Sequence, residues 1–302
     1  MPRIFRLIIT IVVLTAFLLI SQPTLARDWR LIRGGILFGI SGIALVEQKN
    51  DTLKLLIVHD NKQKNQGRLA IISIQGKKPP EYFPIDWPSD TELPIDLEAI
   101  TSVPGKNHTE FIALTSFGKA YYIQLNPAKK AVRVIKEFNL PAVPKSSNFE
   151  GFSLQDIDNK IIAMWAHRGA IEQPGIIYWG IFDLAKYQIT LAGSSNLQVP
   201  FPSENVRHIS DIKIDPTGVV YITSTSDPGD DGPFQSAVYV AGSLGFDSNK
   251  ILWRQNTEFT PLHRSNYRKI EGIELVPGAN GGVVLGTDDE NFGSSVYIMG
   301  EK

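Results

Sequence analysis

The chain has 302 residues, of which 43% are hydrophobic and 20% charged, and its formal net charge is −1. This composition is that of a globular protein rather than a disordered one, and a charge so close to zero argues against nucleic acid as a partner. Cysteine is absent, which excludes disulfides, thiolate metal sites and cysteine nucleophiles.

The first 26 residues are predicted to be a secretory signal peptide. Arg3 and Arg6 give a basic start, residues 7–20 are almost wholly apolar, and residues 22–26 look like a processing site. The apolar run is short for a membrane span, and an uncleaved anchor is the alternative. We therefore expect an exported protein, periplasmic, lumenal or extracellular, in which residues 27–302 form a single domain without membrane contact after cleavage.

A short phrase recurs five times along this domain. Each copy begins with Ser or Glu, continues with a small residue or Asp, and then alternates apolar residues. The copies begin at Ser41, Glu98, Glu150, Ser210 and Glu271, so that successive copies are 57, 52, 60 and 61 residues apart. A period of this length is typical of radial repeat folds.

Short β-rich runs, separated by clusters of Gly, Pro, Asn and Asp, follow each phrase. They predict four strands per repeat, in chain order 41–46, 54–59, 68–74 and 81–85; 98–103, 110–115, 119–125 and 131–138; 150–155, 160–166, 175–182 and 187–192; 209–214, 218–224, 236–241 and 249–254; and, in the fifth repeat, 271–276, 281–287 and 294–299. The fifth repeat is one strand short, and residues 29–32 supply one strand too many before the first. Pairing these two closes a ring, so the sequence predicts an all-β fold, a five-bladed β-propeller of four-stranded blades.

The five leading residues are expected to meet at one mouth of the central channel, because the first strand of each blade lines it. Three carboxylates near one axis repel each other, so either some are protonated or a cation lies between them. Ca²⁺ accepts six to eight oxygen ligands in a flexible arrangement, which makes it the expected cofactor. The predicted metal ligands are Ser41, Glu98, Glu150, Ser210 and Glu271. In the alternative interpretation these residues cap the channel strands and bond backbone amides or water.

The order Ser, Glu, Glu, Ser, Glu around five blades resembles the calcium-activated nucleotidase (apyrase) family. This resemblance implies a secreted or lumenal five-bladed propeller that holds Ca²⁺ with one Ser or Glu from each blade and hydrolyses nucleoside diphosphates. The long nucleotide-contacting inserts of that family are absent here. The Glu271-Gly-Ile phrase with its Asp-rich turn also looks like the esterase-like phytase propellers.

We therefore expect a calcium-dependent phosphohydrolase that acts on nucleotides or phosphate esters. The candidates for the general base are Asp60, Asp211, Asp288 and Asp289, and those for binding the anionic substrate are Arg168, Arg264 and Arg268. For each of them a role as a solvated turn residue is the plainer alternative.

Two other functions compete with this hypothesis. The first is a non-catalytic propeller whose structural cation supports a surface that binds a protein or a small ligand. The second is glycan processing by paired carboxylates, which the shared ring position of the three glutamates disfavours.

Overall fold

The computed structural model describes residues 29–141, 143–144, 146–248, 250–277 and 282–300. The predicted signal peptide, residues 1–26, lies outside these ranges. Among the described residues, no helix is long and apolar enough to cross a membrane. Two short 3₁₀ turns interrupt the strands, η1 (Ile36–Phe38) and η2 (Glu290–Phe292).

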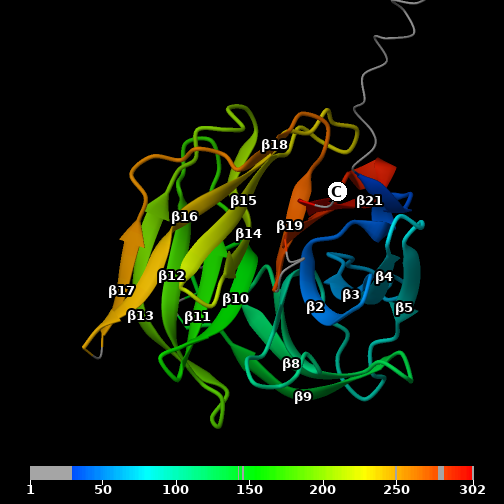
Figure 1. Cartoon of the computed structure of the whole chain (residues 1–302), viewed down its shortest axis with the longest axis horizontal. Helices are drawn as coiled ribbons and strands as arrows, with labels where there is room; N and C mark the ends of the chain where they lie inside the picture. Colours follow the sequence, from blue (N-terminus) through cyan, green and yellow to red (C-terminus); the bar gives the residue numbers. More distant parts are fainter. Residues whose placement is uncertain (1–28, 142, 145, 249, 278–281, 301–302) are drawn as a thin grey trace, which may run out of the picture.

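Five antiparallel sheets are arranged around a common axis (Figure 1). Blade 1 contains β2 (Gly42–Lys49), β3 (Thr52–Val58), β4 (Leu69–Gln75) and β5 (Glu81–Ile85). Blade 2 contains β6 (Leu97–Ser102), β7 (Glu110–Thr115), β8 (Lys119–Asn126) and β9 (Ala131–Asn139). Blade 3 contains β10 (Phe149–Ile157), β11 (Lys160–His167), β12 (Gly175–Asp183) and β13 (Gln188–Leu197). Blade 4 contains β14 (Val206–Ile214), β15 (Val219–Ser226), β16 (Ser236–Asp247) and β17 (Lys250–Gln255), and blade 5 contains β19 (Ile270–Val276), β20 (Gly282–Thr287), β21 (Ser294–Met299) and β1 (Arg30–Arg33).

The predicted five-bladed propeller is confirmed, and each predicted strand has an observed counterpart, although β2, β13, β14 and β16 extend three or more residues beyond their predicted bounds. Strand β13 runs to Leu197, beyond the predicted end at residue 192, and β16 runs to Asp247. The short strand β18 (His263–Ser265) was not predicted, and it pairs with β16. Outer strands are exposed on one side, so their residues carry little of the apolar pattern by which a strand is recognised in sequence.

The ring closes as predicted, by pairing the two ends of the domain. Strand β1 pairs antiparallel with β21, so that Leu31 lies opposite Ser295. Without β1, the backbone groups of β21 would form an open edge.

The inner strands approach each other closely, which explains the small residue in the second place of the repeated phrase. A Cβ atom on Gly42 would lie 2.9 Å from Cα of Ala99 in the next blade. A Cβ atom on Gly151 would lie 2.8 Å from the amide nitrogen of Ile212. Because backbone meets backbone at these points, a larger side chain cannot move aside.

Polar side chains of the inner strands also connect each blade to the next. At four places, a side-chain oxygen on one inner strand accepts a hydrogen bond from a backbone N–H of the inner strand in the next blade. The acceptor and donor pairs are Thr101 with Leu154, Ser153 with Ile214, Asp211 with Ile273, and Glu274 with Leu45. The buried ammonium of Lys213 reaches across the channel to the carbonyl of Ile100, at 2.7 Å. The blades are therefore joined around the axis by hydrogen bonds as well as by apolar packing.

The substitution Gly42→Ala tests the close contact of the inner strands. The added methyl group would overlap the backbone of Ala99, and we expect the free energy of unfolding to fall by about 1–3 kcal/mol. Gly245→Ala is the matched control, because nothing lies within 4 Å of a Cβ atom there. Denaturant unfolding of both variants checks this, and equal stability of the two would contradict the packing described.

Candidate functional site

Each of the three ring glutamates lies in a β-bulge at the start of its inner strand. In blade 2, Leu97 pairs with Thr115 and Ala99 with Leu114, so that Glu98 is the extra residue. Glu150 and Glu271 occupy the same place in blades 3 and 5. A bulge bends the strand and redirects the side chain of the extra residue. All three side chains are buried, and the three carboxylates lie close enough for those of Glu150 and Glu271 to raise the pKa of Glu98.

Protein cations neutralise two of these carboxylates. Nη1 of Arg207 lies 2.9 Å from Oε1 of Glu271 and 3.8 Å from Oε2 of Glu150, and its Nη2 contacts Asp227. Nη1 of Arg168 lies 3.3 Å from Oε1 of Glu150. Burial by itself lowers the pKa of Arg207, but Glu150 and Glu271 raise it well above its usual range. Arg207 is therefore charged and holds blades 3, 4 and 5 together at the mouth.

Lys269 completes this basic side of the mouth. Its Nζ lies 3.2 Å from Oε1 of Glu271 and also contacts Glu290. The ammonium is almost fully buried, and although burial lowers its pKa, Glu271 and Asp288 raise it above its ordinary value. Glu271 thus has two cationic partners, Arg207 and Lys269.

On the other side of the mouth, three carboxylates lie close together and have fewer cationic side chains beside them than would be needed to neutralise their charge. Asp60, Asp96 and Glu98 each place one oxygen within 4.8 Å of the other two. Asp96 accepts a hydrogen bond from Ser116 and pairs with Lys62 at 2.9 Å. Among the described residues, the side chains of Asp60 and Glu98 have no hydrogen bond and no ion pair. We call Asp60, Asp96 and Glu98 the acidic cluster.

Burial and mutual repulsion raise the pKa values of this cluster. Burial raises the pKa of Glu98 well above its usual range, and the charges of Glu150 and Asp60 raise it further. Burial raises the pKa of Asp60 to about 6, with a contribution from Glu271. A cation placed among these oxygens would lower both values and stabilise the ionised forms.

Ser41 has a hydroxyl oxygen without a partner, and it precedes a residue that packs on the strand of Glu98. Its hydroxyl is buried, and no group in the described part of the chain forms a hydrogen bond with it. Because Gly42 packs on Ala99 and Ile100, Ser41 lies next to the bulge that carries Glu98. Three carboxylates and a hydroxyl form a set of hard oxygen donors that fits Ca²⁺.

The predicted ring of five ligands is therefore divided into two halves. Ser41 and Glu98 belong to the unpaired side, whereas Glu150 and Glu271 are bound by protein cations. Ser210 donates a hydrogen bond to the carbonyl of Ile270, at 2.8 Å, and its oxygen lies 2.9 Å from the hydroxyl of Thr223.

The other predicted site residues lie at three places. Asp60, Asp288 and Arg168 are at the mouth, where burial raises the pKa of Asp288 well above its usual range and Glu271 raises it further. Asp289 pairs with Arg268 at 2.7 Å in an adjoining pocket.

Asp211 and Arg264 lie away from both the mouth and the adjoining pocket. The buried carboxylate of Asp211, whose pKa burial raises to about 7, accepts backbone hydrogen bonds from Ile212 and Ile273. The guanidinium of Arg264, on β18, lies over the ring of Phe201.

Sequence analysis missed three charged residues of the mouth as site residues, namely Asp96, Arg207 and Lys269. Each precedes a ring residue by two or three positions, Asp96 and Lys269 just before an inner strand and Arg207 at the start of β14. That regular offset could have identified them, but their burial becomes visible only in the assembled ring.

No protein-family model matches the chain, and no curated protein matches its sequence. Similarity is found among solved structures. A family GH43 endo-arabinanase from Bacillus licheniformis superposes with a TM-score of 0.50 at 13% identity, over 88% of this chain and 95% of that one. A putative exo-β-1,3-galactanase from Bifidobacterium bifidum s17 gives a TM-score of 0.50 at 11% identity, over 90% and 91%.

At these identities the similarity shows a shared fold alone. Both structures are named as carbohydrate-cleaving enzymes, and neither is a nucleotidase or a phytase, the two groups that the ring residues resemble. The resemblance of the sequence thus correctly predicted the propeller, while the named structural neighbours belong to other families.

Removal of Arg207 tests the charge balance of the mouth. Arg207→Gln leaves Glu150 without its main cation, so its carboxyl pKa, already raised by burial, rises further above the unfolded-state value. A carboxyl group whose pKa is higher in the folded state than in the unfolded state holds its proton more tightly when the protein is folded. The free energy of unfolding therefore falls as pH increases.

We therefore expect Arg207→Gln to be about 3 kcal/mol less stable than the parent at pH 8 and much closer to it near pH 4. Denaturant unfolding across this pH range checks the prediction. Arg133→Gln, at an exposed arginine on β9, is the control and should have little effect at any pH. A deficit for Arg207→Gln that is independent of pH would show that the carboxylates are not its cause.

Proposed function

We propose that the central mouth is a calcium-dependent hydrolytic site for phosphate esters in an exported protein. The observation that carries this proposal is the acidic cluster, in which the half-buried Asp60 and the buried Glu98 form no ion pair within the described part of the chain, and the nearby ammonium of Lys62 is paired with Asp96. Burying ionised groups without partners is costly, so a bound cation is the simplest compensation. Asp60, Asp96, Glu98 and Ser41 would hold it.

The basic half of the mouth suits the anionic part of such a substrate. Arg168 is the accessible cation of this half, with about a third of its side chain exposed. It keeps N–H groups beyond its bond to Glu150, and a guanidinium can bind two phosphate oxygens at once. Lys269 is buried and the side chain of Arg207 is 16% exposed, and both add positive charge to this half.

The chemistry then divides between the two halves. Ca²⁺, when bound, supplies a Lewis acid that polarises a phosphoryl oxygen and offsets the charge that develops on it. Arg168 orients the phosphate. Asp288 is the carboxylate that we assign as the acceptor of the proton from the attacking water, since it lies at the mouth near Asp60 and Glu271. A cation bound among these carboxylates would favour the ionised form of Asp288, which this role requires.

Glycoside hydrolysis is the second candidate function. It is favoured by the same unpaired carboxylates, because cleavage of a glycosidic bond needs one carboxyl group as acid and a second as base or nucleophile. An endo-arabinanase and a putative exo-β-1,3-galactanase share the fold. This function would require no cation at the acidic cluster.

A calcium titration with a phosphate-release assay tests the first proposal. We expect saturating Ca²⁺ to raise the melting temperature by on the order of 5 °C and to activate release of phosphate from ADP or from glycerol phosphate. Glu98→Gln should abolish both effects. Glu92→Gln, at a carboxylate that is 80% exposed, is the matched control and should keep them.

Other results of this experiment would contradict the proposed function, and each points to a different alternative. A calcium-induced rise in melting temperature without any phosphate release would make the protein a non-catalytic propeller with a structural cation. Release of sugar from arabinan or β-1,3-galactan without added Ca²⁺, lost in Glu98→Gln, would establish the glycosidase instead. No response to Ca²⁺ in either assay would overturn the metal site.

A further inference from the structure

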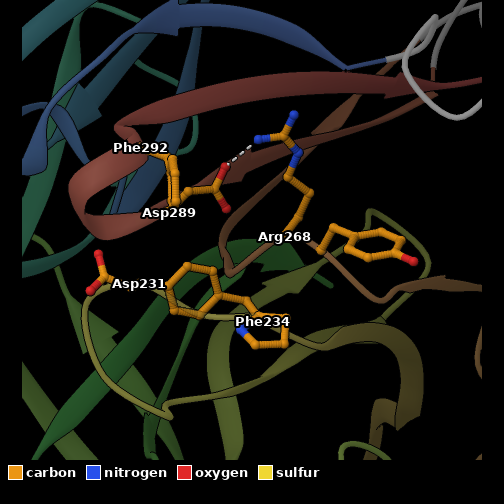
Figure 2. A pocket seen from close by; sticks show the side chains of 7 residues that line it. Asp231, Phe234, Arg268, Asp289 and Phe292 are labelled. Carbon is orange, nitrogen blue, oxygen red and sulfur yellow. Dashed lines mark hydrogen bonds and ion pairs between the residues drawn. The ribbon is translucent and has the colours of Figure 1, made fainter.

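A second cavity opens beside the central mouth. It has a volume of about 350 Å³ and lies between the loop after β15, the loop before β19 and the turn η2. Figure 2 shows the paired side chains of Arg268 and Asp289 on one side, and the ring of Phe234 with the carboxylate of Asp231 on the other. We call this cavity the aromatic pocket.

The aromatic pocket shares a wall with the mouth. Arg268 and Lys269 are consecutive, yet Arg268 pairs with Asp289 in the pocket whereas Lys269 pairs with Glu271 in the mouth. Asp288 and Asp289 are also consecutive: Asp288 lies near Glu271 in the mouth, and Asp289 lines the pocket. The wall between the mouth and the pocket is therefore built from two pairs of consecutive residues.

The apolar lining of the pocket is unusually open to solvent. Tyr267 is 66% exposed and Phe292 is 60% exposed, although Phe234 below them is buried. Both exposed rings lie in short loops whose backbones are tied down by hydrogen bonds of Asp289 and Ser265. Exposed aromatic rings at a preformed cavity are typical of a ligand-binding surface.

The polar lining offers charges of both signs. Arg268 uses one nitrogen for Asp289, at 2.7 Å, which leaves further N–H donors. One oxygen of Asp231 accepts from Asn291, at 3.0 Å, and its second oxygen has no hydrogen-bond partner among the described residues. The pocket therefore combines a donor-only group, an acceptor-only group and aromatic faces.

We propose that the aromatic pocket binds a sugar ring. The hydroxyls of a sugar both donate and accept hydrogen bonds, so they can satisfy Asp231 and Arg268 at once, and the C–H faces of the ring can pack on Tyr267 or Phe292. A nucleobase would stack on the aromatic rings, but it has fewer groups around its edge that can both donate a hydrogen bond to Asp231 and accept one from Arg268. Where the proposed phosphohydrolase function holds, on which this extension rests, the substrate class is a phosphorylated carbohydrate.

Binding of free sugars tests this inference without any assay of activity. Saturation-transfer difference NMR on the full domain with glucose, galactose and arabinose should detect at least one sugar, with a dissociation constant on the order of millimolar, as expected for a ligand of this size. Tyr267→Ala and Phe292→Ala should each weaken that binding roughly 5- to 10-fold. Both residues are exposed, so neither substitution should impair folding.

Phe117→Ala is the matched control, because Phe117 is also an exposed aromatic residue, 61% accessible, in the corresponding loop of blade 2. It should leave sugar binding unchanged. Three results would overturn the inference: no sugar binds, adenosine binds in preference to all three sugars, or the Phe117 variant loses binding as much as the pocket variants. Because these measurements need neither Ca²⁺ nor turnover, sugar binding without phosphate release would refute the proposed function alone.

Discussion

The close approach of five inner strands around one axis is the constraint on which the rest of this structure depends. Where Gly42 meets Ala99 there is no space for a side chain, so a small residue follows the leading Ser or Glu in every blade except the fourth, where Asp211 follows Ser210. The leading residues themselves have to face one another, because the bulges at Glu98, Glu150 and Glu271 turn them inward. Carboxylates forced together must then be neutralised, and the two halves of the mouth differ in how this is achieved.

That difference gives the mouth its polarity. Arg207 and Lys269 come from blades 4 and 5 and neutralise the carboxylates nearest to them. Blades 1 and 2 bring Asp60, Asp96 and Glu98 together, and among the described residues only Lys62, a mostly exposed side chain, forms an ion pair with them. An acidic side and a basic side thus face each other across a small opening, an arrangement suited to a cation and an anion bound together.

The sequence predicted the fold well because the fold is periodic. Five copies of one phrase determined the number of blades, and the unmatched strand at residues 29–32 revealed how the ring closes. It predicted that Ser41 and Glu98 lie at the mouth, but not that Arg207 and Lys269 pair with Glu271. Which carboxylate meets Arg207 depends on how far a long side chain reaches between blades, and Tyr267 and Phe292 meet in one pocket only because loops of different lengths fold against each other.

The pairing of β1 with β21 has a consequence for the order in which the protein is completed. Strand β1 is made first, yet its only partner strand is the last of the described strands to be synthesised. Until then, β1 lacks its partner strand and blade 5 is incomplete. A growing chain therefore cannot close the ring until residues 294–299 have emerged, so the last of these strands completes the pairing of the first.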